Sequence, residues 1–124
     1  MPMQPQLNTR ASVDQTKAPD GGSVAVLRFT GDITSTSRDV VFGAYQEVPI
    51  ATHRVVLDFS KMEYMNSSGI ALIIELLMAA NKVNRTVQSF GLSPHFQKVF
   101  TMVGLNKYTS LHPDEATACA AFID

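Results

Sequence analysis

The sequence predicts an α/β domain with a mixed sheet of about four or five strands, an opening antiparallel hairpin and about four helices. The first observation is size and composition, because 124 residues that are 45% apolar and 17% charged suit one hydrophobic core. The second is a Pro-Asp-Gly-Gly turn at residues 19–22, which separates two strand-like segments. The third is that helical and strand patterns alternate after residue 30, as in βαβ units with a largely parallel sheet.

The amino-terminal part is predicted to contain a tail and a hairpin. Residues 1–9 combine prolines with polar side chains, and their apolar residues follow neither helical nor strand periodicity. We therefore expect a flexible tail there and one domain over residues 10–124. Strands are expected over residues 10–17 and 23–30, on either side of the turn. The second strand is the more apolar one and contains Val24, Val26, Leu27 and Phe29.

The centre of the chain is predicted to form a helix, a buried strand and a second helix. Apolar side chains recur at helical spacing ahead of Pro49, at Val40, Val41, Ala44, Tyr45 and Val48. Residues 54–59 (RVVLDF) form a short apolar run with β-branched side chains, which indicates a strand covered on both faces at the centre of the sheet. The second helix is expected from residue 67 to about residue 83.

This second helix has an unusually apolar sequence. Glu75 is the one charged residue between positions 70 and 80. A helix that is apolar nearly all round must be covered on more than one side, so we expect part of its first two turns to be exposed as an apolar patch for a partner. The candidates for this patch are Ile70, Ile73, Ile74 and Leu77.

The carboxyl-terminal part continues the alternation. A strand is expected over residues 86–90. A helix is then expected, with Ser93 as its N-cap, Pro94 in its first turn and Gly104 at its end. The apolar face of this helix comprises Phe96, Val99, Phe100 and Val103. A short strand near residues 107–111 and a helix from residue 113 to about 122 complete the fold.

Charge and cysteine content limit the partners and the compartment. Ten Lys and Arg residues against 11 Asp and Glu residues give a net charge of −1, so we expect neither direct nucleic-acid binding nor an acidic membrane surface as partner. Cys119 is the single cysteine and no secretion signal begins the sequence, which favours a cytoplasmic protein. No stretch approaches the roughly 20 apolar residues that span a bilayer, so no membrane insertion is expected.

The sequence does not favour an enzyme. His53, His95 and His112 lack metal-ligand spacing, and neither Cys-x-x-Cys nor a phosphate-binding glycine motif occurs, so we expect no metal and no cofactor. Residues 65–69 match half of the hydrolase motif Gly-x-Ser-x-Gly, but Met65 replaces the first glycine and a loop is expected over residues 60–66. A hydrolase that uses Ser67 is a minor alternative, and it would need His95 or His112 within about 3 Å of that hydroxyl.

Residues 58–70 carry the functional interpretation. They lead from the carboxyl end of a predicted parallel strand into the apolar helix, at the edge where ligands and partners of open α/β sheets gather. Asn66, Ser67 and Ser68 all suit a helix N-cap, but one cap suffices, and Gly69 in the first turn costs about 1 kcal/mol relative to alanine. A phosphate on a hydroxyl here would meet unpaired backbone N–H groups. The pattern therefore favours a serine that another protein modifies over a serine that catalyses.

The chain resembles the STAS-domain family, and within it the single-domain anti-sigma factor antagonists, also called anti-anti-sigma factors. The similarity spans residues 10 to about 123 and is carried by segments 29–33 (FTGDI), 55–70 and 93–105, with Asn66-Ser67-Ser68-Gly69 as its most specific part. In that family a partner kinase, which is also the anti-sigma factor, phosphorylates the second serine of an Asp-Ser-Ser-Gly motif. A serine phosphatase resets the cycle.

The resemblance implies a phosphorylation-controlled, protein-binding switch. Ser68 would be the phosphoacceptor, and the unmodified protein would bind an anti-sigma factor that is also a serine protein kinase. Asn66 stands where the family usually has aspartate, and Thr34 stands where the segment after Gly31 usually has a second acidic residue. The predicted partner-binding residues are Asp32, Asn66, Ser67, Gly69 and Ile70, which lie in the resembling segments, and Ile73, which belongs to the expected apolar patch.

A structural subunit of similar fold is the main alternative. In the STAS component of a lipid-transport ATPase complex, the serine would only cap the helix or contact a partner. Gene neighbourhood separates the two functions, because a histidine-kinase-like ATPase encoded next to this protein supports the switch and a transporter ATPase supports the subunit.

Overall fold

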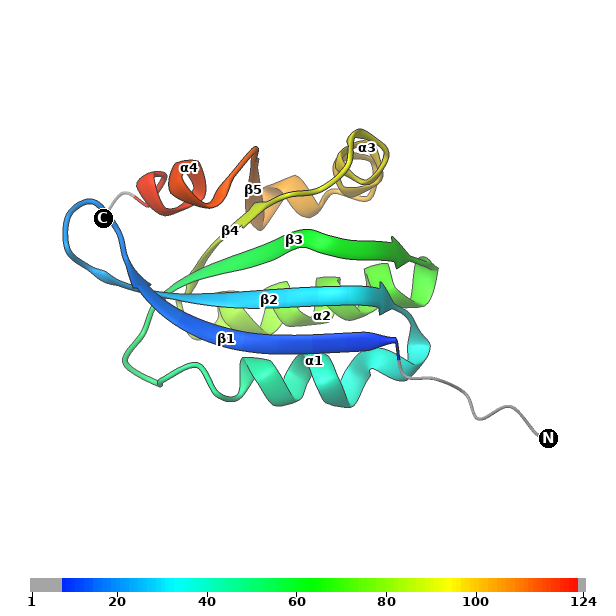
Figure 1. Cartoon of the computed structure of the whole chain (residues 1–124), viewed down its shortest axis with the longest axis horizontal. Helices are drawn as coiled ribbons and strands as arrows, with labels where there is room; N and C mark the ends of the chain where they lie inside the picture. Colours follow the sequence, from blue (N-terminus) through cyan, green and yellow to red (C-terminus); the bar gives the residue numbers. More distant parts are fainter. Residues whose placement is uncertain (1–7, 123–124) are drawn as a thin grey trace.

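Five strands form one sheet in the order β1-β2-β3-β4-β5 (Figure 1). The computed structural model describes residues 8–122. Strands β1 and β2 are antiparallel, and the β2-β3, β3-β4 and β4-β5 pairs are parallel. The elements are β1 (Thr9–Lys17), β2 (Ser23–Ile33), η1 (Ser35–Ser37), α1 (Arg38–Tyr45), β3 (Arg54–Met65), α2 (Ser67–Lys82), β4 (Thr86–Phe90), α3 (Pro94–Met102), η2 (Leu105–Lys107), β5 (Thr109–His112) and α4 (Glu115–Ala120). The predicted mixed sheet, its antiparallel hairpin and its central strand are confirmed.

The hairpin turn follows the predicted chemistry, and the first strand begins earlier than predicted. Gly21 has a φ of 86°, a conformation that favours glycine, and the carboxylate of Asp20 accepts a hydrogen bond of 2.9 Å from the backbone of Gly22. Thr9, which the sequence assigned to the tail, lies in β1 with a buried side chain. Its hydroxyl donates to the carbonyl of Asp32 and is hydrogen-bonded to Ser37. Residues 1–7 of the predicted tail lie outside the described residues.

Strand β3 is longer than the apolar run that identified it. The sequence predicted a strand over residues 54–59 and a loop over residues 60–66, and the loop prediction is wrong because the strand continues to Met65. The partner of this extension is β2, which itself runs on to Ile33 and pairs with Met65. Two register shifts along the pair absorb the extra residues of β3. Pairing with a neighbouring strand, and not local apolar character, therefore extends β3 to the start of α2.

The core lies on both faces of the sheet, with unequal cover. Alternate residues of a strand point to opposite faces, so Leu27 joins a large cluster and its neighbour Val26 a small one. The large cluster is covered by α1, α2, α3 and η2, which contribute residues such as Val41, Ile73, Phe100 and Leu105. Helix α4 and the residues that follow it cover the small cluster with Ala118, Cys119 and Phe122. Part of this second face stays polar.

The predicted helix ends are largely confirmed. Ser93 caps α3 by accepting a hydrogen bond from Phe96, proline follows it, and Gly104 has the left-handed φ of 83°. The last helix, predicted from residue 113, begins at Glu115, because the side chain of Asp114 caps it by accepting from the backbone of Thr117 at 2.8 Å. The aromatic ring of Phe100 packs edge-on against Phe59 of β3, with ring centroids 5.5 Å apart.

The hairpin turn is tied to the start of β3 by an ion pair that makes stability depend on pH. Both carboxylate oxygens of Asp20 accept hydrogen bonds from Arg54, at 2.8 and 2.9 Å. Chiefly because of these bonds, the pKa of Asp20 falls from 3.8 to about 2. A carboxyl group whose pKa is depressed on folding contributes stability above its unfolded pKa and loses it as the pH falls through its folded pKa.

We expect Asp20→Asn to lower the Tm at neutral pH, and the difference from wild type to shrink between about pH 4 and pH 2. Circular dichroism melts across this range measure the effect. Glu47→Gln, which removes an exposed carboxylate from the loop after α1, is the matched control. A Tm difference that is constant across the whole range would contradict the expectation.

Candidate functional site

Helix α2 begins one residue after β3, and Asn66 forms the junction. Its side-chain oxygen accepts a hydrogen bond of 2.9 Å from the backbone of Gly69, and its carbonyl accepts one of 2.9 Å from Ile70. Its own N–H donates to the carbonyl of Ile33 at the end of β2, at 3.4 Å. Asn66 is therefore the N-cap of α2, and it fixes the helix start beside β2.

Gly69 allows α2 to approach β2. A Cβ atom at this position would lie 2.0 Å from the carbonyl oxygen of Ile33 and 2.7 Å from its carbonyl carbon. The close backbone is that of Ile33, at the end of β2. Gly69 is buried, and its effect in the structure is to position the first turn of α2; its role as a partner contact stays a prediction.

Ser67 and Ser68 form the exposed first turn of α2. Asn66 caps the helix, so neither hydroxyl is needed for that purpose, and within residues 8–122 the side chain of Ser68 forms no hydrogen bond. The backbone N–H groups of both serines have no acceptor within the helix, as in any first turn. The turn contains no acidic residue. A negative group on Ser68 would thus meet the positive end of the helix dipole and no like charge within that turn.

A shallow hollow of about 130 Å³ lies beside Ser68, between α1 and α2. Its walls come from Thr34, Ser35, Arg38, Ser68, Ala71, Leu72 and Glu75. A guanidinium nitrogen of Arg38 lies 2.6 Å from a carboxylate oxygen of Glu75, and both side chains are more than half exposed. The site thus combines an accessible hydroxyl, a cation and an anion. The sequence singled out Glu75 as the one charged residue of the apolar helix segment, but it did not pair Glu75 with Arg38, because α1 and α2 are separated by β3 along the chain.

The structure places the other predicted contact residues differently. Ile73 is fully buried in the large core cluster, so it is not part of an exposed apolar patch, and its contact with a partner stays a prediction. Leu77 is buried as well, whereas Ile70 and Ile74 are half-buried at the edge of that cluster. The expected apolar patch is therefore reduced to the flank of α2 that carries Ile70 and Ile74.

Asp32 is half-buried near the end of β2 and lines a different hollow, of about 300 Å³. The side chain of Asn8 donates to its carboxylate at 3.3 Å, and Arg10 and Glu63 line the same hollow. The next residue, Ile33, contacts α2. Asp32 at the end of β2 and Ser68 at the start of α2 are therefore near each other in the fold, but they line two separate hollows.

Comparison with known protein families gives one assignment. The family model described as "Mlab, STAS domain" matches residues 18–113, which is most of the chain. The chain belongs to the STAS-domain family. The resemblance noted from residues 29–33, 55–70 and 93–105 is thereby confirmed. A comparison with curated proteins finds no match.

Solved structures share the fold of this STAS domain at low sequence identity. An anti-sigma factor antagonist from Mycobacterium paratuberculosis superposes with a TM-score of 0.72 at 19% identity, covering 89% of this chain and 90% of the other. The Bacillus cell fate determinant SpoIIAA, in its phosphorylated form, gives 0.58 at 20% identity, covering 86% and 95%. The murine anion transporter Slc26a9 gives 0.66 at 13% identity, covering 89% of this chain and 21% of the transporter. The STAS fold therefore occurs both in single-domain proteins and within a transporter.

The two histidines that the hydrolase alternative requires have other contacts in the structure. The extended β3 leads directly into α2 through Asn66, contrary to the predicted loop. However, a ring nitrogen of His112 lies 2.7 Å from the side-chain oxygen of Gln88 on β4, and the ring of His95 packs against Phe96 on α3. Within residues 8–122, neither histidine forms a hydrogen bond with Ser67.

In the described part of the chain, no three His, Cys, Asp or Glu side chains gather as a metal site would require. No helix in that part is long and apolar enough to cross a membrane.

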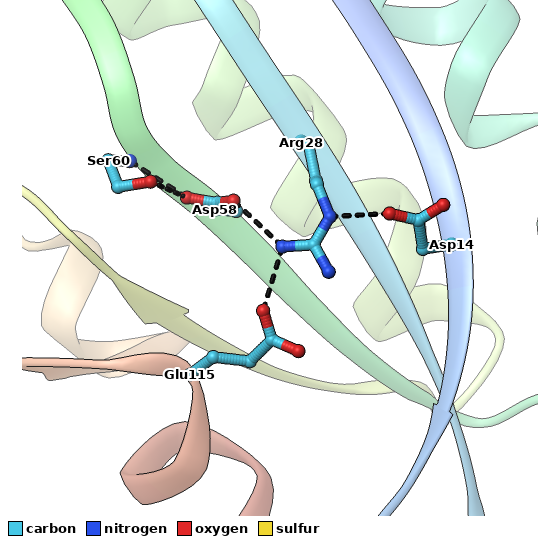
Figure 2. Close-up of polar contacts among 5 residues, drawn as sticks. All are labelled: Asp14, Arg28, Asp58, Ser60 and Glu115. Carbon is cyan, nitrogen blue, oxygen red and sulfur yellow. Dashed lines mark hydrogen bonds and ion pairs between the residues drawn. The ribbon is translucent and has the colours of Figure 1, made fainter.

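A second polar cluster lies on the sparsely covered face of the sheet (Figure 2). Arg28 of β2 contacts three carboxylates, with nitrogen-oxygen distances of 2.6 Å to Asp14, 2.9 Å to Asp58 and 2.7 Å to Glu115. Glu115, and then Asp14 and Asp58, raise the pKa of Arg28 above its ordinary value against the opposing effect of partial burial. The second oxygen of Asp58 accepts two hydrogen bonds from Ser60, at 2.6 and 2.8 Å. The cluster joins α4 to three strands, and we interpret it as structural.

Sequence reasoning missed this cluster, although one signal was present. Asp58 interrupts an otherwise apolar strand, and a carboxylate on a central strand needs a partner when it is buried. Its partner lies 30 positions earlier, and Glu115 lies 87 positions from Arg28. These separations are set by the pairing of β2 with β3 and by the packing of α4, which no local pattern specifies.

Proposed function

We propose that this STAS domain is an anti-sigma factor antagonist that works as a phosphorylation-controlled binding switch. Unmodified, it binds an anti-sigma factor that is also a serine kinase, and phosphorylation of Ser68 releases that partner. A serine phosphatase restores the binding form. The observation that carries the proposal is the exposed Ser68 hydroxyl on the first turn of α2, which Asn66 already caps.

Accessibility and charge both support modification at Ser68. A kinase active site can reach an exposed hydroxyl that makes no hydrogen bond to another described residue. The phosphate product carries about −1.5 to −2 charges, and it would be stabilised by the open N–H groups of the first turn. The cap is an amide in Asn66, so this first turn holds no carboxylate that would repel the phosphate.

The partner contact is proposed to surround Ser68. Ser67 and Ala71 are exposed beside it, and the half-buried Ile70 and Ile74 offer the apolar part of the contact. Asp32 would contact the partner from the hollow at the end of β2. Asn66 acts on this surface through its cap, because it fixes where the first turn lies.

Mapping the phosphorylated residue tests the proposal. We expect that incubation with ATP and a serine kinase encoded next to this protein places one phosphate on Ser68, located by tandem mass spectrometry. Ser68→Ala should abolish the incorporation, and Ser67→Ala, which alters the neighbouring exposed hydroxyl, should retain it. Incorporation into Ser68→Ala at the wild-type level would contradict the proposal.

A structural subunit of a lipid-transport ATPase complex is the second candidate. It is favoured by the presence of the same fold within a membrane transporter chain, Slc26a9. In such a subunit the hydroxyl of Ser68 has no regulatory purpose. Binding of a transporter ATPase with equal affinity by wild type, Ser68→Ala and Ser68→Asp would favour this candidate over the switch.

A further inference from the structure

The ion pair between Arg38 and Glu75 shares one hollow with Ser68. Ser68 and Glu75 are seven residues apart on α2, which places them on the same side of the helix, about 10 Å apart along its axis. Arg38 reaches this side from α1 and bonds Glu75 at 2.6 Å. Its guanidinium also lies 4.9 Å from the ring centroid of Phe42, one turn further along α1.

This ion pair is exposed and exchangeable. The side chains of Arg38 and Glu75 keep 57% and 53% of their surface in solvent. Exposed pairs of this kind contribute little to stability, because water screens them and two long side chains must be ordered. Arg38 can therefore leave Glu75 at low cost when a stronger acceptor is present.

A phosphate on Ser68 is such an acceptor. It carries more negative charge than a carboxylate and presents three oxygens, and a guanidinium can donate two parallel hydrogen bonds to it. Ser68 and Arg38 both line this hollow, Ser68 from α2 and Arg38 from α1. The exchange would require the Arg38 side chain to turn from Glu75 towards Ser68, which lines the same hollow.

We propose that Arg38 is the receptor for the phosphate on Ser68, and that phosphorylation makes Arg38 exchange Glu75 for the phosphate. This inference rests on the proposed function, since it describes the regulated state of the same site. The exchange leaves the carboxylate of Glu75 unpaired on the exposed flank of α2. Phosphorylation thus changes the partner surface at two places, first at Ser68 and then two turns along the helix.

A titration of the phosphate tests the exchange without a kinase. Phosphoserine is incorporated at position 68 during translation, and ³¹P NMR follows its second ionisation, which is near pH 6 in a free phosphoserine. In wild type we expect the pKa of the phosphate to lie about 0.5 units below that in Arg38→Gln, as for an exposed ion pair. Helix dipole effects are the same in both proteins and cancel in the difference.

Two further variants make the experiment specific. Glu75→Gln removes the competing carboxylate, so the pKa of the phosphate should fall below the wild-type value. Lys82→Gln removes an exposed cation from the far end of α2 and should leave that pKa unchanged. All three altered side chains are exposed, and circular dichroism verifies that the variants fold.

The outcomes separate this inference from the proposed function. Equal phosphate pKa values in wild type and Arg38→Gln would overturn the exchange, whether or not a kinase modifies Ser68. A failure of the kinase to modify Ser68 would overturn the proposed function, and it would not alter the titration because the phosphoserine is encoded. A shift that Arg38→Gln removes and Glu75→Gln enlarges supports the exchange.

Discussion

Phosphorylation of Ser68 is expected to weaken partner binding by roughly a thousandfold, which corresponds to about 4 kcal/mol. The reason is electrostatic: in the proposed complex the partner covers the first turn of α2, and a phosphate driven into a desolvated contact loses hydration and meets charges arranged for a neutral hydroxyl. The domain itself should stay folded, because the phosphate points to solvent in the free protein. Isothermal titration of the partner kinase with modified and unmodified protein measures the affinity, and circular dichroism monitors the fold.

Three variants check this expectation. Ser68→Ala should bind the partner and resist release by ATP, and Ser68→Asp should bind weakly, although aspartate carries less charge than phosphate. Ser67→Ala is the matched control and should be released as wild type is. Equal affinity of the phosphorylated and unmodified proteins would rule out the switch.

Replacement of Gly69 by alanine is expected to lower the free energy of unfolding by about 3 kcal/mol, at the upper end of what overpacking usually costs. The added Cβ would lie 2.0 Å from the carbonyl oxygen of Ile33, which is backbone of a paired strand and cannot rotate away. The first turn of α2 must therefore shift, and Ser68 with it. Urea denaturation measures the stability, and phosphorylation of the folded fraction should also slow.

Gly43→Ala is the matched control for this prediction. Gly43 lies inside α1, and a Cβ there would meet no atom within 4 Å. Because alanine is favoured over glycine in a helix interior by about 1 kcal/mol, Gly43→Ala should stabilise the domain. If the two variants had the same stability, the close contact between Gly69 and Ile33 could not be the cause.

The sequence alone determined the features that depend on near neighbours. Asn66 begins α2 and Ser93 begins α3 because a side-chain oxygen bonds an N–H group three residues further on. The turn at residues 19–22 and strand β4 follow from local chemistry in the same way. The exposed Ser68 belongs to this group, because its exposure depends on its place in the first turn of a capped helix.

Tertiary structure decided the features that depend on distant parts of the chain. The continuation of β3 to Met65 requires the backbone of β2, and the burial of Ile73 depends on which side of an apolar helix faces the sheet. Glu75 acquires Arg38 as its partner only when α1 packs beside α2. Sequence periodicity gives the faces of a single element, whereas strand pairing and helix packing join residues whose separation along the chain carries no local signal. The position of the serine is therefore determined by sequence, and the charges that surround it are determined by the fold.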